Sequence, residues 1–154
     1  MANNEKKYLF QKSVIIKCRL EEIFNFHLDT NNLPKISPLF PKAAVKKISE
    51  IPLRKNSTVT VSLNFLLFKS DWEILIRELE ANKLIGDLQT KGIFEYWYHS
   101  HIFDLKGNEV RMTDKVEFIP PFGILGKIFI PLIQFHLYIM FKHRHKKTKM
   151  IFEN

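Results

Sequence analysis

Residues 94–103 read Phe-Glu-Tyr-Trp-Tyr-His-Ser-His-Ile-Phe, and this run places large rings on both faces of any strand it forms. Side chains alternate between the two faces of a β-strand. One face therefore carries Trp97, His99 and His101, with the two imidazoles roughly 7 Å apart, and the other carries Tyr96 and Tyr98. Neither face suits free exposure to water, and imidazoles beside a tryptophan need polar partners. The run therefore predicts a sheet that wraps around a cavity.

The remaining periodicity predicts an α+β protein. Alternating apolar and polar residues indicate antiparallel strands, which we expect at 8–19, 43–50, 57–68, 71–80, 83–90, 94–103 and 109–119. Helical spacing predicts two short helices after the first strand, near 20–28 and 31–36, and one long helix at 124–150. A twisted antiparallel sheet of six to seven strands curls, so a long C-terminal helix in its concave side would close the core.

One acidic residue interrupts the apolar face predicted for the last strand. Asp114 lies among alternating apolar residues, and a buried carboxylate requires a partner. The turn signal at Gly107 joins this strand to the histidine strand as a hairpin. Pairing centred on Gly107 puts Ser100 opposite Asp114, whereas an offset of one or two residues puts His99 or His101 there.

The C-terminal segment allows two interpretations. Residues 122–141 are long and apolar enough for a membrane span, but they include Pro131, which should kink or unwind a helix. We favour a closing helix, because the curved sheet otherwise has nothing to cover its apolar side. Its expected cavity-facing stripe comprises Leu125, Ile128, Phe129, Leu132, Phe135, His136 and Ile139.

Composition limits the function classes. The chain has 154 residues, enough for a single domain covering 1–154, and its net charge is +8. No RNA-binding aromatic signature or zinc-finger spacing accompanies the basic residues, so we expect no nucleic-acid partner. Cys18 is the only cysteine, and the first residues lack a signal-peptide core. These features predict a cytoplasmic protein.

The order of elements resembles the helix-grip fold of the START/Bet v 1-like superfamily, also called the polyketide cyclase/dehydrase and lipid-transport (SRPBCC) superfamily. The resemblance is greatest to a bacterial ligand-binding branch. Its pattern is matched by Trp72, Asp87, Gln89, Gly92, Phe94, Trp97, His99, His101, Phe103, Asp114, Pro121, Phe122, Gly123 and Gly126, and by Phe24, Phe26 and His27 in the first helix. The chain departs from the pattern at Ile93, where proline is frequent, and at Asn108, where threonine is frequent. The resemblance implies a ligand-binding cavity, and that some relatives catalyse cyclisation or dehydration there.

We therefore predict that a hydrophobic small molecule or lipid binds between sheet and helix. The expected ligand-binding residues are Trp72, Trp97, His99, His101, Met112, Asp114, Phe118, Phe129, Leu132, Phe135 and Ile139. We expect no metal and no cofactor, because two histidines and one carboxylate lack a further firm ligand. One alternative is an enzyme of the cyclase/dehydrase kind using His99 or His101 as general base beside Asp114. Another is a membrane-associated interaction protein that uses helix 124–150, and the partners expected besides a ligand are a membrane surface in peripheral contact and a second copy in a homodimer.

Overall fold

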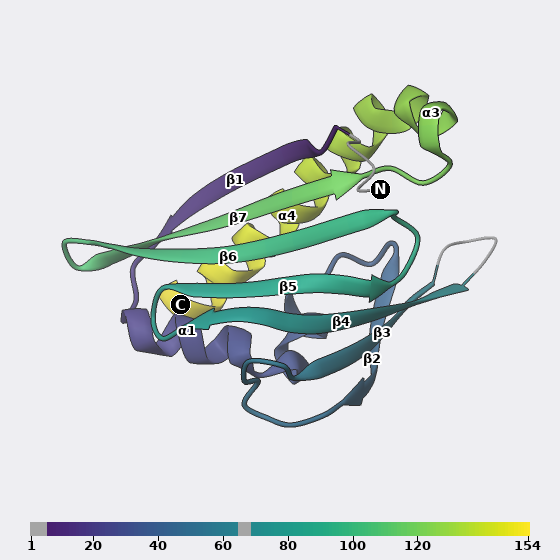
Figure 1. Ribbon diagram of the computed structural model, residues 1–154. Coiled ribbons are helices and arrows are strands. Elements are labelled where there is room, and N and C mark those ends of the chain that lie inside the picture. The colour runs from purple at the N-terminus through teal and green to yellow at the C-terminus, as the bar shows by residue number, and fades with distance from the viewer. Residues whose placement is uncertain (1–5, 65–68) are drawn as a thin grey trace.

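The computed structural model describes residues 6–64 and 69–154 of the chain. Its β-strands form one antiparallel sheet in the order β1-β7-β6-β5-β4-β3-β2 (Figure 1). The strands are β1 (Tyr8–Ile16), β2 (Lys42–Ile48), β3 (Thr58–Asn64), β4 (Lys69–Glu80), β5 (Leu84–Lys91), β6 (Tyr96–Lys106) and β7 (Glu109–Ile119). The predicted strand 57–68 is confirmed as far as Asn64, and its part at 65–68 lies outside the described residues.

Short helices follow β1, and a long helix ends the chain. The helices are α1 (Leu20–Leu28), η1 (Thr30–Asn32), α2 (Leu33–Ile36), α3 (Gly123–Gly126), η2 (Lys127–Phe129) and α4 (Ile130–Glu153). Figure 1 shows α4 crossing one face of the sheet diagonally, with its C-terminal end near α1. This is the predicted helix-grip fold: a curved sheet closed by a C-terminal helix.

Proline explains why the last helix is segmented. Pro131 lies in the first turn of α4, where its missing N–H has no intrahelical acceptor to lose. The preceding residues form the 3-10 turn η2 and the short helix α3, so the expected unwinding before Pro131 is observed. By length and composition, the stretch Gly123–Glu153 could cross a membrane. In this structure its α4 part instead packs against the sheet.

Aromatic pairs attach the helices to the sheet. The ring of Phe10 on β1 stacks on Phe141 of α4 with centroids 5.6 Å apart, and Phe24 of α1 meets Phe103 of β6 edge-on at 5.5 Å. All four rings are buried. Such pairs contribute about 0.5–1.5 kcal/mol beyond the area they bury, and they hold α1 and α4 against the same face of the sheet.

The inward face of α4 differs from the predicted stripe. Its buried residues are Leu137, Phe141, His145 and Thr148, whereas Phe135 and Ile139 remain 61% and 49% exposed. The first part of α4 is apolar on nearly every side, so a period of 3.6 residues could not select one stripe. The sheet selects it, because Phe141 stacks on Phe10.

The register of the β6–β7 hairpin decides which residue faces Asp114. Lys106 pairs with Glu109, so the turn consists of Gly107 and Asn108, and His101 pairs with Asp114. The nominal pairing with Ser100 was wrong by one residue, because the turn is centred between Gly107 and Asn108 rather than on Gly107. The offset that puts a histidine opposite Asp114 is therefore the correct one.

Candidate ligand cavity

A cavity of about 790 Å³ lies between the sheet and α4, and most of its wall is apolar. Volumes of about 300–1,000 Å³ are usual for small-molecule sites. Eight of the residues predicted to contact a ligand line this cavity: Trp72, Trp97, His99, His101, Met112, Asp114, Phe129 and Leu132.

Three predicted wall residues lie elsewhere. Phe135 and Ile139 face away from the cavity, because α4 packs a different side of the helix against the sheet. Phe118 is fully buried, but the rings of Tyr8 and Phe94 cover it at centroid distances of 5.9 and 5.7 Å. Phe118 therefore supports the wall from behind rather than forming its surface.

Two tryptophans and a phenylalanine form an aromatic platform in the wall. Trp72 of β4 and Trp97 of β6 have ring centroids 5.0 Å apart, and Phe94 lies 4.8 Å from Trp97. The indole N–H of Trp72 donates to the side-chain carbonyl of Gln89, whose amide donates to the backbone carbonyl of Phe94 at 2.7 Å. Gly92 lies against the Trp72 ring, where a β-carbon would collide with the indole. The platform is thus an apolar surface with fixed geometry.

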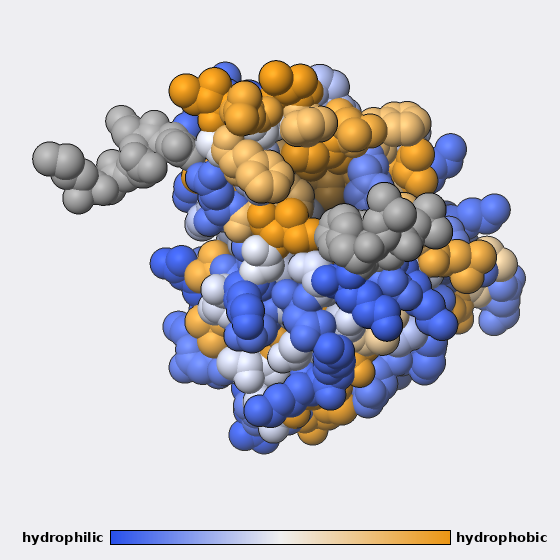
Figure 2. Space-filling view, turned by 90° about the vertical axis from the view of Figure 1, so that its right-hand side faces the viewer, coloured by the Kyte–Doolittle hydropathy of each residue, from blue (hydrophilic) through white to orange (hydrophobic). Residues whose placement is uncertain are grey.

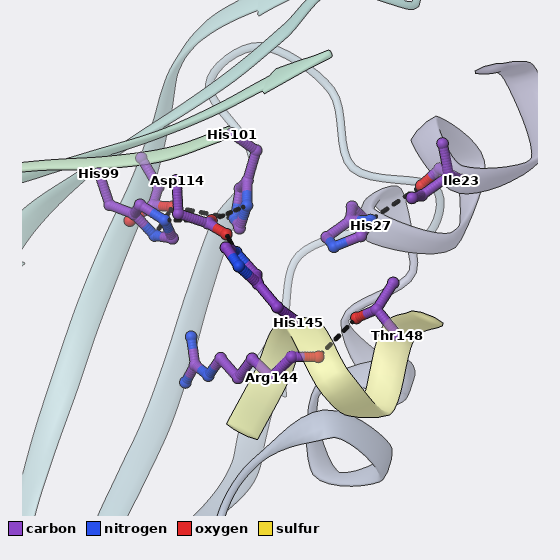
Figure 3. A network of polar contacts seen from close by, with 9 residues as sticks. Ile23, His27, His99, His101, Asp114, Arg144, His145 and Thr148 are labelled. Carbon is purple, nitrogen blue, oxygen red and sulfur yellow. Dashed lines mark hydrogen bonds and ion pairs between the residues drawn. The ribbon is translucent and has the colours of Figure 1, made fainter. Parts of the chain in front are cut away.

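Asp114 is the centre of a buried polar cluster facing the same cavity (Figure 3). One of its oxygens, Oδ1, lies 2.8 Å from Nε2 of His99 and 2.7 Å from Nδ1 of His101. The other, Oδ2, lies 2.5 Å from Nε2 of His145 on α4. Asp87 on β5 approaches the cluster from the opposite side, 3.4 Å from Nδ1 of His99 and 4.0 Å from Nε2 of His101. Strands β6 and β7 and helix α4 therefore meet at the Asp114 carboxylate, and β5 supplies a second carboxylate, Asp87.

The charges and the burial of the cluster give His99 and His101 different pKa values. Burial opposes protonation of His99, but the nearby charges of Asp87 and Asp114 outweigh it and raise the pKa of His99 to about 9. Burial and the charge of His99 lower the pKa of His101. Burial opposes ionisation of Asp114, but His101 and the surrounding hydrogen bonds hold its pKa well below the usual value. At neutral pH His99 is therefore an imidazolium between two carboxylates, and His101 is neutral.

Tautomer and geometry give the two imidazoles different chemical roles. Both ring N–H groups of His99 face carboxylates, so His99 is fixed and has no proton acceptor. His101 directs Nδ1 at Asp114, which leaves Nε2 as its acceptor nitrogen. His27 of α1 packs on His101 with centroids 5.1 Å apart, and burial followed by the charge of the His101 ring lowers the pKa of His27 to about 3. Of His99 and His101, it is therefore His101 that can accept a proton or a hydrogen bond.

Sequence reasoning missed two members of the site on α4. His145 and Arg144 belong to the basic run at 142–149, yet His145 is 3% exposed and Arg144 lines the cavity. A signal was present, because Leu137, Phe141 and His145 recur every four residues and so share one helix face.

A metal ion has one candidate set of ligands among the described residues. A ligand atom from each of Asp87, His99 and His101 lies within 4.8 Å of the others, and Asp114 contacts the opposite nitrogens of both rings, as carboxylates behind metal-bound histidines do. In the cluster as it stands, His99 carries a proton between the two carboxylates. A metal ion would have to displace that proton, so the expectation of no metal remains a prediction.

Comparison with known proteins finds likeness in structure rather than in sequence. No protein-family model matches the chain, and no curated protein matches it. A START superfamily protein from Mycobacterium smegmatis superposes with a TM-score of 0.71 at 14% identity, over 94% of this chain and 97% of that one. Ginseng major latex-like protein 151 from Panax ginseng superposes with a TM-score of 0.69 at 12% identity, over 95% and 97%.

A third similar structure comes from a biosynthetic pathway. The di-domain ARO/CYC StfQ from the steffimycin biosynthetic pathway superposes with a TM-score of 0.71 at 7% identity, over 96% of this chain and 51% of that one. At such low identities the likeness shows the fold alone. The fold is that of the helix-grip proteins, and the predicted resemblance to the START/Bet v 1-like superfamily is confirmed at that level.

Proposed function

We propose that this protein binds a hydrophobic small molecule or lipid, non-covalently, in the cavity between the sheet and α4. The observation that carries the proposal is the cavity itself: about 790 Å³, walled mainly by apolar side chains, with one buried polar cluster. Micromolar affinity corresponds to about 8 kcal/mol. Apolar burial contributes about 25 cal/mol per Å², so a ligand covering several hundred Å² of wall supplies this after ordering costs are met.

The two tryptophans provide a direct test, because both are in the cavity wall and the chain has no others. Purified protein is titrated with the neutral dye N-phenyl-1-naphthylamine, and tryptophan emission and energy transfer to the dye are recorded. We expect saturable binding at one site. Native mass spectrometry of the same preparation reports any co-purified ligand. Absence of both saturable dye binding and a co-purified ligand would defeat the proposal.

A pair of adjacent alanines gives matched variants for that titration. Ala43 on β2 lines the cavity, whereas Ala44 points to the other face of the strand and is exposed. Ala43→Phe should fill part of the cavity and weaken dye binding about tenfold or more, as loss of roughly 1.4 kcal/mol implies. Ala44→Phe adds the same ring outside and should leave binding unchanged. Equal effects of the two variants would show that the dye binds elsewhere.

An apolar rim at the mouth of the cavity supports loading from a membrane surface. We define this rim as Phe122, Ile124, Leu125, Ile128, Phe129 and Leu132, which are 52–80% exposed. Phe122, Phe129 and Leu132 also line the cavity. Figure 2 shows hydrophobic side chains gathered at the top of the molecule, where α3 and the start of α4 lie. Lys127 is the one charged residue within 122–132, so this face suits shallow insertion between lipids.

The membrane contact that we propose is peripheral, and a cytoplasmic location stays a prediction. The competing occupant of the rim is a second copy of the chain, and binding to lipid vesicles distinguishes a membrane surface from that copy. The basic run at 142–149 lies several turns along α4 from the rim, at a rise of about 1.5 Å per residue. Apolar insertion rather than that run would therefore provide the contact.

A second candidate function is catalysis, favoured by one observation. Neutral His101, whose Nδ1 faces Asp114, has Nε2 without a hydrogen bond, 4.0 Å from Asp87, in a cavity that could hold an aromatic or ketide-like substrate. His99 does not fit the role of base, because its pKa is raised and both its nitrogens face carboxylates. Once a ligand is identified, His101→Ala should abolish turnover while retaining binding if this alternative holds. Unchanged turnover would exclude His101 as base.

A further inference from the structure

Arg144 on α4 brings a positive charge into a cavity whose wall is otherwise mainly apolar. The residue lines the cavity, one helical turn from Phe141, over whose ring its guanidinium carbon lies at 5.6 Å. Burial lowers the pKa of Arg144 from its ordinary value, yet a guanidinium retains its proton in proteins. In Figure 3 its side chain extends away from the α4 backbone and ends apart from the cluster around Asp114.

The guanidinium has no anionic partner among residues 6–64 and 69–154. No carboxylate of these residues lies within 4.0 Å of it, and its Nε is buried without a hydrogen-bond acceptor. The dashed line at Arg144 in Figure 3 belongs to its backbone carbonyl, which accepts from the Thr148 hydroxyl at 2.9 Å. An unpaired buried charge is expensive, so this arginine is either hydrated or meets an anion that the chain does not supply.

The acids nearest to it are already engaged. Asp114 receives three imidazoles, and Asp87 faces His99 and His101. Asp29, the other acid in the wall, accepts a hydrogen bond from the backbone N–H of Asn31. The charges of Asp114 and Asp87 favour the charged form of Arg144 only from a distance. The carboxylates of the cluster therefore face imidazoles, and the buried Nε of the guanidinium has no acceptor.

We propose that Arg144 binds the anionic oxyacid head group, a carboxylate or phosphate, of an amphipathic ligand whose apolar body lies against the rest of the cavity wall. The inference rests on the proposed function, since it presumes that a ligand enters the cavity. A guanidinium matches two oxygens of a carboxylate or phosphate with parallel N–H donors. Its partly buried position limits competing water, which strengthens that pairing. The aromatic platform would pack against the apolar body of the ligand.

The test compares ligands that differ only in the head group. Wild-type protein is titrated at pH 7.4 with dodecanoate, dodecyl phosphate and the neutral 1-dodecanol, following tryptophan emission. Hydrogen bonds to charged groups contribute about 1.5–3 kcal/mol, so we expect one or both anions to bind at least about tenfold more tightly than the alcohol. Which anion is preferred identifies the source of the head group as a fatty acid or a phosphate ester.

Three variants test whether Arg144 causes the preference for an anionic head group. Arg144→Met should bring the anions to the affinity of the alcohol while changing alcohol binding less than about twofold, and Arg144→Lys should keep part of the preference. Lys142→Met, an exposed basic residue two positions away, should change nothing. Arg144→Met should also leave the midpoint of thermal unfolding of the empty protein unchanged or raised, because it removes an unpaired buried charge. A marked loss of stability there would instead indicate a structural role and count against the proposal.

The outcomes separate the two proposals. If 1-dodecanol binds and the anions bind no more tightly, or if their advantage persists in Arg144→Met, the anionic anchor is overturned and hydrophobic binding stands. If none of the three probes binds to the wild-type protein, the proposed function fails and this inference fails with it.

Discussion

His101 and Asp114 face each other across the β6–β7 hairpin, and Nδ1 of His101 lies 2.7 Å from Oδ1 of Asp114. The same carboxylate contacts His99 on β6 and His145 on α4. One acidic side chain thus joins the sheet to the helix that closes it. This relationship predicts that the polar cluster contributes to the stability of the fold as well as to the chemistry of the cavity.

Asp114→Asn should strongly destabilise the protein. The change removes the negative charge that pairs with the buried His99 imidazolium and weakens the bond to His145. Breaking a buried ion pair from one side costs about 3–5 kcal/mol, to be measured as the free energy of unfolding in urea. Asp104→Asn, on the exposed end of β6, is the matched control and should change it by less than about 0.5 kcal/mol. Similar values for the two variants would contradict a stabilising cluster.

His99 predicts a loss of stability at alkaline pH. Its folded-state pKa of about 9 lies above the ordinary value of 6.5, so the folded protein holds a proton that the unfolded chain releases. The resulting stabilisation is complete below about pH 6.5 and declines as pH rises through 9. Urea unfolding of wild-type protein and His99→Gln between pH 6 and 10 measures it. The wild-type curve should fall across this window, and the variant's should fall less. Parallel curves would show that His99 is not protonated in the folded state.

Phe118 and Phe135 were both predicted to contact the ligand, but they differ in their exposure to solvent. Phe118 is fully buried, so Phe118→Ala should cost about 3–5 kcal/mol of unfolding free energy. Phe135 is 61% exposed on α4, so Phe135→Ala should cost about 0.5 kcal/mol or less. Neither residue lines the cavity, and Phe135→Ala should leave dye affinity unchanged. A large loss of stability for Phe135→Ala would show that α4 turns its predicted stripe inward after all.

The apolar rim should bind lipid vesicles. Ile124 and Ile128 are 80% and 74% exposed and do not line the cavity, so the double change Ile124→Ser and Ile128→Ser should reduce vesicle co-sedimentation several-fold without altering dye affinity. Each buried apolar side chain contributes about 1.5–3 kcal/mol. Leu105→Ser, which changes an exposed apolar residue at the β6–β7 turn, is the control.

Vesicle composition and protein mass distinguish the occupants of the rim. Binding to neutral phosphatidylcholine vesicles as well as to anionic ones is expected if apolar insertion dominates. A protein that is dimeric by sedimentation, becomes monomeric in the rim variant and ignores both vesicle types would instead assign the rim to a second copy of the chain.

Local rules predicted the strands and the sites of polar chemistry. Period-two alternation predicted the β6 and β7 segments, because every second residue of an antiparallel strand faces the interior and is apolar. The hairpin turn brought a histidine opposite Asp114 to within one residue, the remaining error being the position of the turn's centre. His99, His101 and Asp114 were conspicuous because polar residues interrupted apolar faces.

Local rules did not predict which side of the last helix faces the sheet. Phe135 and Leu137 are equally apolar, yet one is exposed and the other buried, since a helix that is apolar all round carries no record of which side meets the sheet. His145 and Arg144 lie in a run of basic residues, whose charge alone does not show which of them face the cavity.

The sequence by itself determined an antiparallel sheet with a polar patch in its concave face and a long apolar helix to cover it, because alternation and turn residues act over a few neighbouring positions. Only the tertiary structure decided how that helix is rotated, and with it which basic side chains enter the cavity. That rotation depends on contacts such as Phe10 with Phe141, which lie 131 positions apart in the chain. Packing between distant segments fixes what local periodicity leaves free.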